Sequence, residues 1–249
     1  MYIKPRHSSG FFYTVCCTLS ACRFPCSSYH CLVLIFPNLH THIPQPDNPW
    51  QIMNVHEKPE ALLPAVCSIG LHPWYLDEKT WKESFSQVKQ LALQPEVLAI
   101  GECGLDTLCP TPFALQQTVF TEQVLLANTL NKPLIIHCVR AHAAVVQILQ
   151  DLQVSVPVIF HGFNRNIHIA QQLLAHHYYL SFGKALFNDV VRKVFEEIPT
   201  HAIFLETDHA AISIEDVYSE AAKLKRENLT KFVQQIHQNY FRVFGVRFT

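Results

Sequence analysis

Six side chains that are able to bind a metal ion follow apolar, strand-like runs along this chain. They are His40, His42, Glu102, His137, His161 and Asp208. The runs that contain them span residues 31–42, 97–106, 133–138, 157–163 and 202–208. In a parallel α/β barrel the carboxyl ends of all strands open onto one rim, so we expect the six side chains to share one site. Imidazoles and carboxylates together suit a divalent metal, which activates water for hydrolysis.

His40 and His42 are separated by one residue, and alternate side chains of a strand point to the same face. The pair is therefore able to hold one cation. Taken alone the pattern is weak, because the chain has 15 histidines and such a pair also occurs as surface decoration. The other strand-end residues favour the metal site.

The two carboxylates are the predicted catalytic residues. Glu102 follows the apolar run 97–101, where burial of a charge is costly unless cations or donors pair with it. A position between two metals would meet that need, and the alternative is an exposed glutamate at the strand mouth. Asp208 follows the run 202–207, and an aspartate there can bind metal and take a proton from the attacking water. We therefore predict Asp208 as the general base.

His137 and His161 each end an apolar strand, and the repeated context favours metal binding over an ordinary hydrogen-bonded core histidine. Three further residues are predicted substrate contacts: His72, Glu206 and His209. For the two histidines an ordinary loop position is the alternative. Glu206 has two alternatives, a partner that supports a metal ligand from behind or a polar group at the barrel mouth. Asp106 is expected to stabilise its loop.

The apolar pattern predicts alternating strands and helices from residue 65 onward. Strands are expected at 65–71, 97–102, 133–138, 156–161, 178–182 and 202–206, after a first strand at 31–42. Helices are expected at 78–93, 113–130, 141–152, 165–176, 187–197, 215–226 and 229–243. Residues 42–58 are rich in proline and predict a loop, with a short strand at 51–55. The alternation is typical of an α/β fold with a parallel sheet and helices packed outside.

Length and composition indicate one domain, at residues 31–249, after an extension of doubtful order at 1–30. That extension only vaguely resembles a secretion signal. The net charge of −1 excludes a broad basic field, so a polyanionic substrate would be bound locally. The scattered cysteines indicate reduced thiols and a cytoplasmic protein, and no run is long enough to span a membrane. No obligate protein partner is expected.

Ordered motifs between about Leu32 and Phe244 resemble the TatD family of metal-dependent, amidohydrolase-like hydrolases. The motifs are HTH (40–42), GLHPW (70–74), AIGECGLD (99–106), PLIIHC (133–138), FHGF (160–163) and LETD (205–208). The resemblance implies a distorted TIM-type (β/α)8 barrel and a deoxyribonuclease that acts on DNA or another phosphodiester. It also implies two divalent ions, Mg, Mn or Zn. His40, His42, Glu102 and Asp208 would hold one ion, and Glu102, His137 and His161 the other.

The chain departs from the family pattern where Asn38-Leu39 precedes the histidine pair and His209-Ala210 follows Asp208. The short interval between His42 and His72 also predicts one reduced β/α unit near the N-terminus. These departures leave the substrate open. A metal-dependent hydrolase of a non-nucleic ester, lactone or amide is the alternative, and a metal-binding scaffold without turnover is a third hypothesis.

Overall fold

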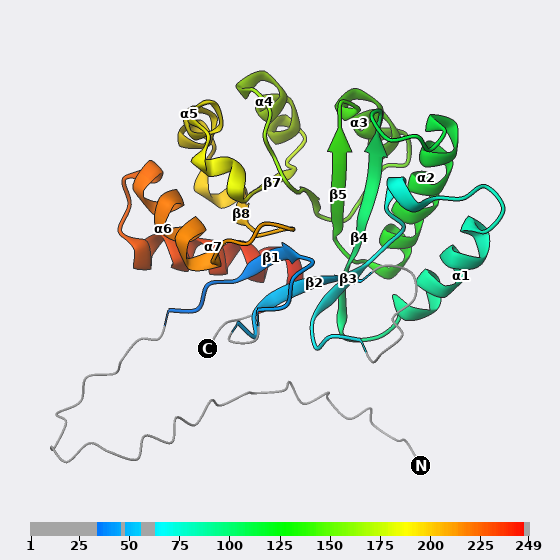
Figure 1. The fold of residues 1–249 in the computed structure, drawn as a ribbon, viewed down its shortest axis with the longest axis horizontal. Coiled ribbons are helices and arrows are strands. Elements are labelled where there is room, and N and C mark those ends of the chain that lie inside the picture. The colour runs from blue at the N-terminus through cyan, green and yellow to red at the C-terminus, as the bar shows by residue number, and fades with distance from the viewer. Residues whose placement is uncertain (1–33, 46–47, 56–62, 247–249) are drawn as a thin grey trace, which may run out of the picture. The chain divides into compact units, whose positions relative to one another are not determined.

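The computed structural model describes residues 34–45, 48–55 and 63–246 (Figure 1). The predicted extension at 1–30 lies outside the described residues. Within the described ranges, no helix combines the length and the apolar character that crossing a membrane requires.

Eight parallel strands form one sheet, in which neighbouring strands follow the order of the chain. Their bounds are β1 Asn38–Thr41, β2 Gln51–Val55, β3 Cys67–Ile69, β4 Val97–Asp106, β5 Leu134–Val139, β6 Val158–Phe160, β7 Tyr179–Phe182 and β8 Ile203–Leu205. The segment after β8 bonds back to β1, since Asp208 N donates to His40 O at 2.9 Å and His42 N donates to Asp208 O at 3.2 Å. The sheet therefore closes into a barrel, which confirms the predicted fold class.

Helices lie outside the strands in Figure 1. The α-helices are α1 Trp81–Leu91, α2 Phe113–Leu130, α3 His142–Asp151, α4 Ile167–Ala175, α5 Asp189–Glu197, α6 Ile214–Lys225 and α7 Leu229–Phe244. Short 3-10 turns are η1 Pro73–Tyr75, η2 Lys184–Phe187 and η3 Thr200–Ala202. Side-chain caps begin several helices, as where Ser213 Oγ accepts from Asp216 N at the start of α6.

The strands are apolar because both of their faces are covered. Leu134, Ile135 and Ile136 of β5 are fully buried, with alternate side chains inside the barrel and against the helices. The apolar runs found in the sequence are thus the walls of one core, and the polar residues that follow them reach the rim.

The predicted reduction near the N-terminus is confirmed among the described residues. No described residue between β1 and β3 is helical, and β2 occupies the short segment at 51–55. Most other predicted bounds agree within a few residues. Two strands differ: the first is regular only from Asn38, and β4 continues past Glu102 to Asp106. Glu102 therefore lies inside a strand and not at its end.

Two lysines bond to backbone carbonyls at the opposite, amino-terminal end of the barrel. Lys132 Nζ donates to Ala92 O at 2.5 Å, Val97 O at 2.6 Å and Gln94 O at 3.2 Å. Each of these carbonyls lies near the end of α1 or the start of β4. Because the last carbonyls of a helix have no partner within it, the ammonium satisfies groups that would otherwise be unpaired.

Lys225 does the same for the end of α5. Its Nζ donates to Phe195 O, to Glu196 O at 3.0 Å and to Ile198 O. Burial lowers the pKa of Lys225 to about 8, and the nearby glutamates oppose that shift only in part. At this end of the barrel, lysines at or just after the ends of α2 and α6 therefore donate to backbone carbonyls near the ends of α1 and α5.

Candidate metal centre

Closure of the barrel places Asp208 beside His40 of β1 and His42, which follows β1. Its backbone is held between His40 O and His42 N and has a φ of 51°, a left-handed conformation that aspartate adopts more readily than most residues. Asn38 and Thr207 lock the same seam, because Asn38 Nδ2 donates to Thr207 Oγ1 at 2.8 Å. Asp208 Oδ1 lies 3.7 Å from His40 Nε2 and 3.5 Å from His42 Nε2.

Glu102 reaches the interior of the rim through an irregularity in β4. The register of β4 against β5 shifts around this position, and such bulges redirect a side chain. Gly101 has a φ of 153°, and a Cβ there would lie 2.5 Å from Ile135 O, so the neighbouring strand leaves room only for glycine. Asn54 of β2 holds the next residue, since its Oδ1 accepts from Glu102 N at 2.9 Å.

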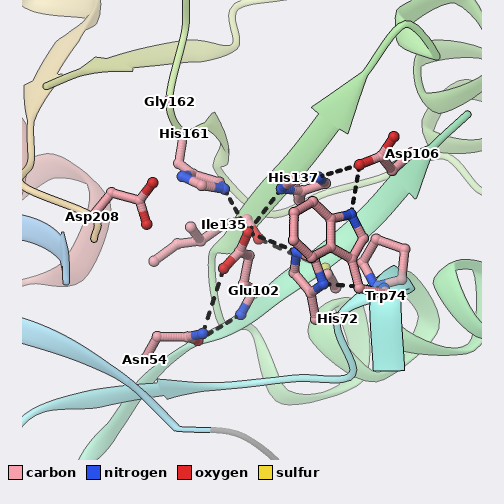
Figure 2. Close-up of polar contacts among 12 residues, drawn as sticks. Asn54, His72, Trp74, Glu102, Asp106, Ile135, His137, His161, Gly162 and Asp208 are labelled. Carbon is pink, nitrogen blue, oxygen red and sulfur yellow. Dashed lines mark hydrogen bonds and ion pairs between the residues drawn. The ribbon is translucent and has the colours of Figure 1, made fainter. Parts of the chain in front are cut away.

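Five imidazoles surround the Glu102 carboxylate, which is 4% exposed. Figure 2 shows the rings of His72, His137 and His161 on one side of it. The rings near Oε2 belong to His40, at 3.2 Å, and His42, at 3.3 Å. The rings near Oε1 belong to His72, at 3.1 Å, His137, at 2.9 Å, and His161, at 2.8 Å. A carboxylate offers about four lone-pair sites, so hydrogen bonds to one acid do not account for five converging rings.

Charge couples the buried carboxylates of this cluster to its rings. Burial raises the pKa of Glu102, but the charge of His161 and hydrogen bonds from the surrounding rings hold it well below its ordinary value. Burial lowers the pKa of His161, and the carboxylates of Glu102 and Glu206 outweigh it and raise that pKa well above the ordinary value. Glu102 is therefore an anion, ready to accept a cation in place of protonated imidazole.

Two further carboxylates lie behind the rings and orient them. Glu206 is 1% exposed, accepts from Gly162 N at 2.7 Å and from Ser181 Oγ, and lies 3.6 Å from His161 Nδ1. Asp106 lies 3.2 Å from His137 Nε2, while His137 Nδ1 points at Glu102. Carboxylates in this position set which ring nitrogen carries a proton and leave the other free for a metal.

The donor set fits divalent metal ions. Three groups of ligand atoms, each within 4.8 Å of one another, are His40 with Glu102 and His161, His40 with His42 and Asp208, and His72 with Glu102 and His137. His40 Nε2, which faces both Glu102 and Asp208, is buried without a hydrogen bond. Because buried polar atoms normally have partners, this atom is suited to bind a metal ion. Nitrogen and carboxylate donors together suit zinc or manganese and also admit magnesium.

Comparison with known proteins decides the family. Residues 50–245 match the family model described as TatD related DNase. The chain belongs to the TatD family. A 3'-5' ssDNA/RNA exonuclease TatD of Cronobacter turicensis is 34% identical over 166 residues, which cover 64% of this chain and 62% of that protein.

A metal-dependent hydrolase of Bacillus subtilis, YabD, is 35% identical over 146 residues, covering 57% of each chain. This chain thus spans about three fifths of the length of these relatives. The crystal structure of the TatD homologue YjjV from Escherichia coli superposes with a TM-score of 0.74 at 23% identity, covering 86% of this chain and 99% of that one. At that identity the likeness concerns the fold.

In this TatD chain the structure brings all six predicted metal ligands together. The rings of His40 and His42 gather at one oxygen of Glu102 and those of His137 and His161 at the other, the grouping that the resemblance implied. The assignment of each ligand to an ion stays a prediction.

The three predicted substrate contacts have different positions. His72 joins the ring cluster around Glu102. Glu206 is buried behind His161, a position that favours the supporting alternative over a substrate contact, and its role stays a prediction. His209 stacks on His42 with ring centroids 3.7 Å apart and is 69% exposed, so a substrate is able to reach it.

Sequence reasoning missed Asn54 and the contact between Trp74 and Asp106. Trp74 Nε1 donates to Asp106 Oδ2 at 2.6 Å, so Asp106 joins a tryptophan to His137 (Figure 2). The sequence signal was the GLHPW motif itself, where Trp74 follows a strand-end histidine. For Asn54 there was no such signal, because a lone asparagine in a short strand is unremarkable.

Proposed function

We propose that this chain is a divalent-metal-dependent hydrolase that cleaves phosphodiester bonds of nucleic acid, as a TatD-type deoxyribonuclease with two metal ions. The observation that carries the proposal is the convergence of five imidazoles on the buried Glu102 carboxylate, with Asp208 beside two of these rings. The name of the Cronobacter relative, a single-strand exonuclease, supports a nucleic-acid substrate. Location in the cytoplasm and independence of a protein partner stay predictions.

Bound divalent ions would acidify a water molecule and offset the charge that develops on the phosphate. Asp208 would take the proton of that water; its 39% exposed side chain, which lies against the histidine pair, supports this role. The water oxygen would bond to phosphorus, the bond from phosphorus to the sugar oxygen would break, and the proton taken by Asp208 would pass to that oxygen. Glu102 is too deeply buried to meet the water and supplies charge and position.

Three cations on neighbouring loops favour a phosphodiester over a neutral ester. Arg140 follows β5, Arg165 follows β6 and Lys184 follows β7, and these strands are adjacent in the barrel. Their loops therefore share one arc of the rim. Burial and then the charge of Arg165 lower the pKa of His142 to about 4, which puts Arg165 near the first turn of α3. Such an arc supplies local attraction that the net charge of −1 does not.

A substrate panel tests the proposal. Chelator-stripped protein is supplied with Mg, Mn or Zn and assayed on single-stranded DNA, a simple phosphodiester, a lactone and an aminoacyl ester. We expect DNA hydrolysis that depends on metal, with about two ions per chain by elemental analysis. Turnover of the lactone or the ester alone would contradict the phosphodiesterase and support the alternative hydrolase. Bound metal without turnover of any substrate would support the metal-binding scaffold.

Two substitutions make the assay specific to the site. Asp208→Asn should lower kcat by about 10²–10⁴-fold, the usual worth of a general base. Asp216→Asn, on the exposed first turn of α6, is the control and should keep full activity. Arg165→Gln should reduce the slope of log affinity for single-stranded DNA against log salt by about 0.7, as expected for one lost phosphate contact. An unchanged slope would remove Arg165 from the binding surface.

A further inference from the structure

Two large aromatic side chains are exposed beside the ring cluster, where burial would be expected for their size. Trp74 is 53% exposed and Tyr75 is 59% exposed, and both lie on η1, directly after His72. Their ring centroids lie 5.4 Å from that of His72, and the Trp74 centroid lies 6.1 Å from that of His137. The pair therefore borders the candidate metal centre.

The Trp74 side chain is held in this exposed position by its only polar atom. Its indole N–H donates to Asp106, which is 1% exposed and which also accepts from Leu108 N at 2.7 Å. The polar edge of the indole is thus turned toward Asp106 (Figure 2). More than half of the residue's surface stays in solvent. A rigid ring of this kind loses little conformational entropy when a flat ligand stacks on it.

The chemistry around the pair favours an uncharged, flat occupant. Asp106 accepts the Trp74 N–H, and Asp77 and Glu78 follow Tyr75 along the chain ahead of one cation, Lys79, so the charge around the pair is net negative and disfavours a phosphate. Arg140, Arg165 and Lys184 lie on the loops after β5, β6 and β7 instead. In nucleic acid every phosphate has a neutral, flat base one sugar away, and bases stack on aromatic side chains regardless of sequence.

We propose that Trp74, flanked by Tyr75, is the stacking site for the nucleobase next to the scissile phosphate. This inference rests on the proposed phosphodiesterase function and adds a binding site to it. A base in a duplex is already stacked on its neighbours, so occupancy requires a single strand or an unpaired end. The site thereby selects unpaired nucleic acid without reading its sequence.

The test measures binding by fluorescence anisotropy on metal-loaded protein. The probes are a labelled single-stranded DNA with phosphorothioate linkages, which resist hydrolysis, the same strand with one terminal base removed, and its duplex. Base stacking is worth roughly 1–3 kcal/mol by substitution, which is about 5- to 150-fold in affinity. We expect the wild type to bind the intact strand at least about fivefold tighter than the abasic strand.

Three variants distinguish a stacking role of Trp74 from a role in positioning His137 through Asp106. Trp74→Leu removes the ring and should bind intact and abasic strands equally. Trp74→Phe keeps a ring face and loses the N–H, so it should keep most of the preference for the intact strand. Phe241→Leu removes another exposed aromatic, on α7, and should match the wild type.

Equal binding of intact and abasic strands by the wild type would overturn the inference. A loss of kcat in Trp74→Leu and Trp74→Phe alike, with the base preference intact, would also overturn it, because Trp74 would then only position His137 through Asp106. Preference for the intact strand without hydrolysis by any metal-loaded form would keep the stacking site and remove the nuclease.

Discussion

The two ends of the barrel handle polar groups in opposite ways. At the amino-terminal end, Lys132 and Lys225 each donate to three backbone carbonyls, and every donor in these contacts meets an acceptor. At the carboxyl-terminal rim, five rings converge on Glu102, and the ring nitrogens of His40 are buried without a hydrogen bond. The lysine contacts at one end pair donors with acceptors of the same chain. The rim instead gathers ligand atoms that suit a divalent metal ion.

The difference separates stability from function. Satisfied carbonyls lower the free energy of the folded state, so the amino-terminal end contributes to stability. A crowded anionic pocket costs desolvation until cations occupy it, so the rim is maintained for its chemistry. Substitutions at the rim should therefore abolish activity with modest effects on melting, and substitutions at the other end should do the reverse.

The largest effect is expected from Glu102→Gln, which keeps the shape of the side chain and removes its charge. The kcat/KM for single-stranded DNA should fall on the order of 10³-fold or more, because the ligands act as one unit. Bound metal should fall in parallel by elemental analysis, while the metal-free protein keeps its circular dichroism spectrum. Glu220→Gln, a buried acid on α6 that pairs with Arg192, is the matched control. Unfolding of the Glu102 variant would show that the rim is needed for stability and would contradict the separation of stability from function.

A smaller loss is expected from Glu206→Gln. The amide oxygen of the new side chain would still accept from Gly162 N, but the variant would no longer offer a charged partner to His161 Nδ1. Loss of such a supporting carboxylate typically costs about 10–100-fold in metal affinity. Titration of stripped protein with Mn or Zn measures the change, and excess metal should restore much of the activity. Activity that stays low at saturating metal would point to a direct role in the reaction.

At the other end, Lys132→Met should lower the free energy of unfolding by about 1–3 kcal/mol, since it leaves the carbonyls of Ala92 and Val97 without their donor. For a protein of this size each kcal/mol corresponds to roughly 2–4 °C in melting temperature. Lys231→Met, at an exposed lysine on α7, should melt like the wild type. The kcat/KM on DNA should be unchanged at a temperature where both are folded, and a large loss of activity would contradict the separation.

The smallest effect concerns pH. Burial lowers the pKa of Lys225 from 10.5 to about 8 in the folded protein. Between these two values the unfolded chain binds more protons than the folded one, so the contribution of Lys225 to stability rises with pH. Urea unfolding at pH 7.5 and pH 9.5 should therefore show a small gain for the wild type relative to Lys225→Met. A relative loss over that interval would mean that the ammonium form is the stabilising one.

Much of the fold and of the cluster follows from local sequence patterns. Apolar runs that end in His137 and His161 indicate both a strand and a rim position, and the short β2 was also predicted at residues 51–55. The barrel closure follows from the alternation of elements, because a parallel sheet of eight strands with outer helices has few alternatives.

The supporting contacts were not predictable, because their partners are distant in sequence and ordinary in type. Lys132 bonds to carbonyls about 35 to 40 residues earlier, and any residue presents the same carbonyl. The apolar pattern puts Glu102 at a strand end. Its position inside β4 was not predictable, because the register shift around Glu102 depends on how closely β5 approaches Gly101. The burial of Glu206 is equally hidden, because alternation along a strand gives the face of a residue but not how deeply the next strand covers it.

The seam between β1 and the residues after β8 determines when a newly made chain becomes active. His40 and His42 bond through their backbones to Asp208, so the junction that completes the sheet also brings the proposed base to its histidines. On the proposed function, a nascent chain has no hydrolytic activity until its eighth strand has left the ribosome. Its first turnover would then coincide with the final step of folding, and a fragment that ends before residue 203 would be inert toward the nucleic acid around it.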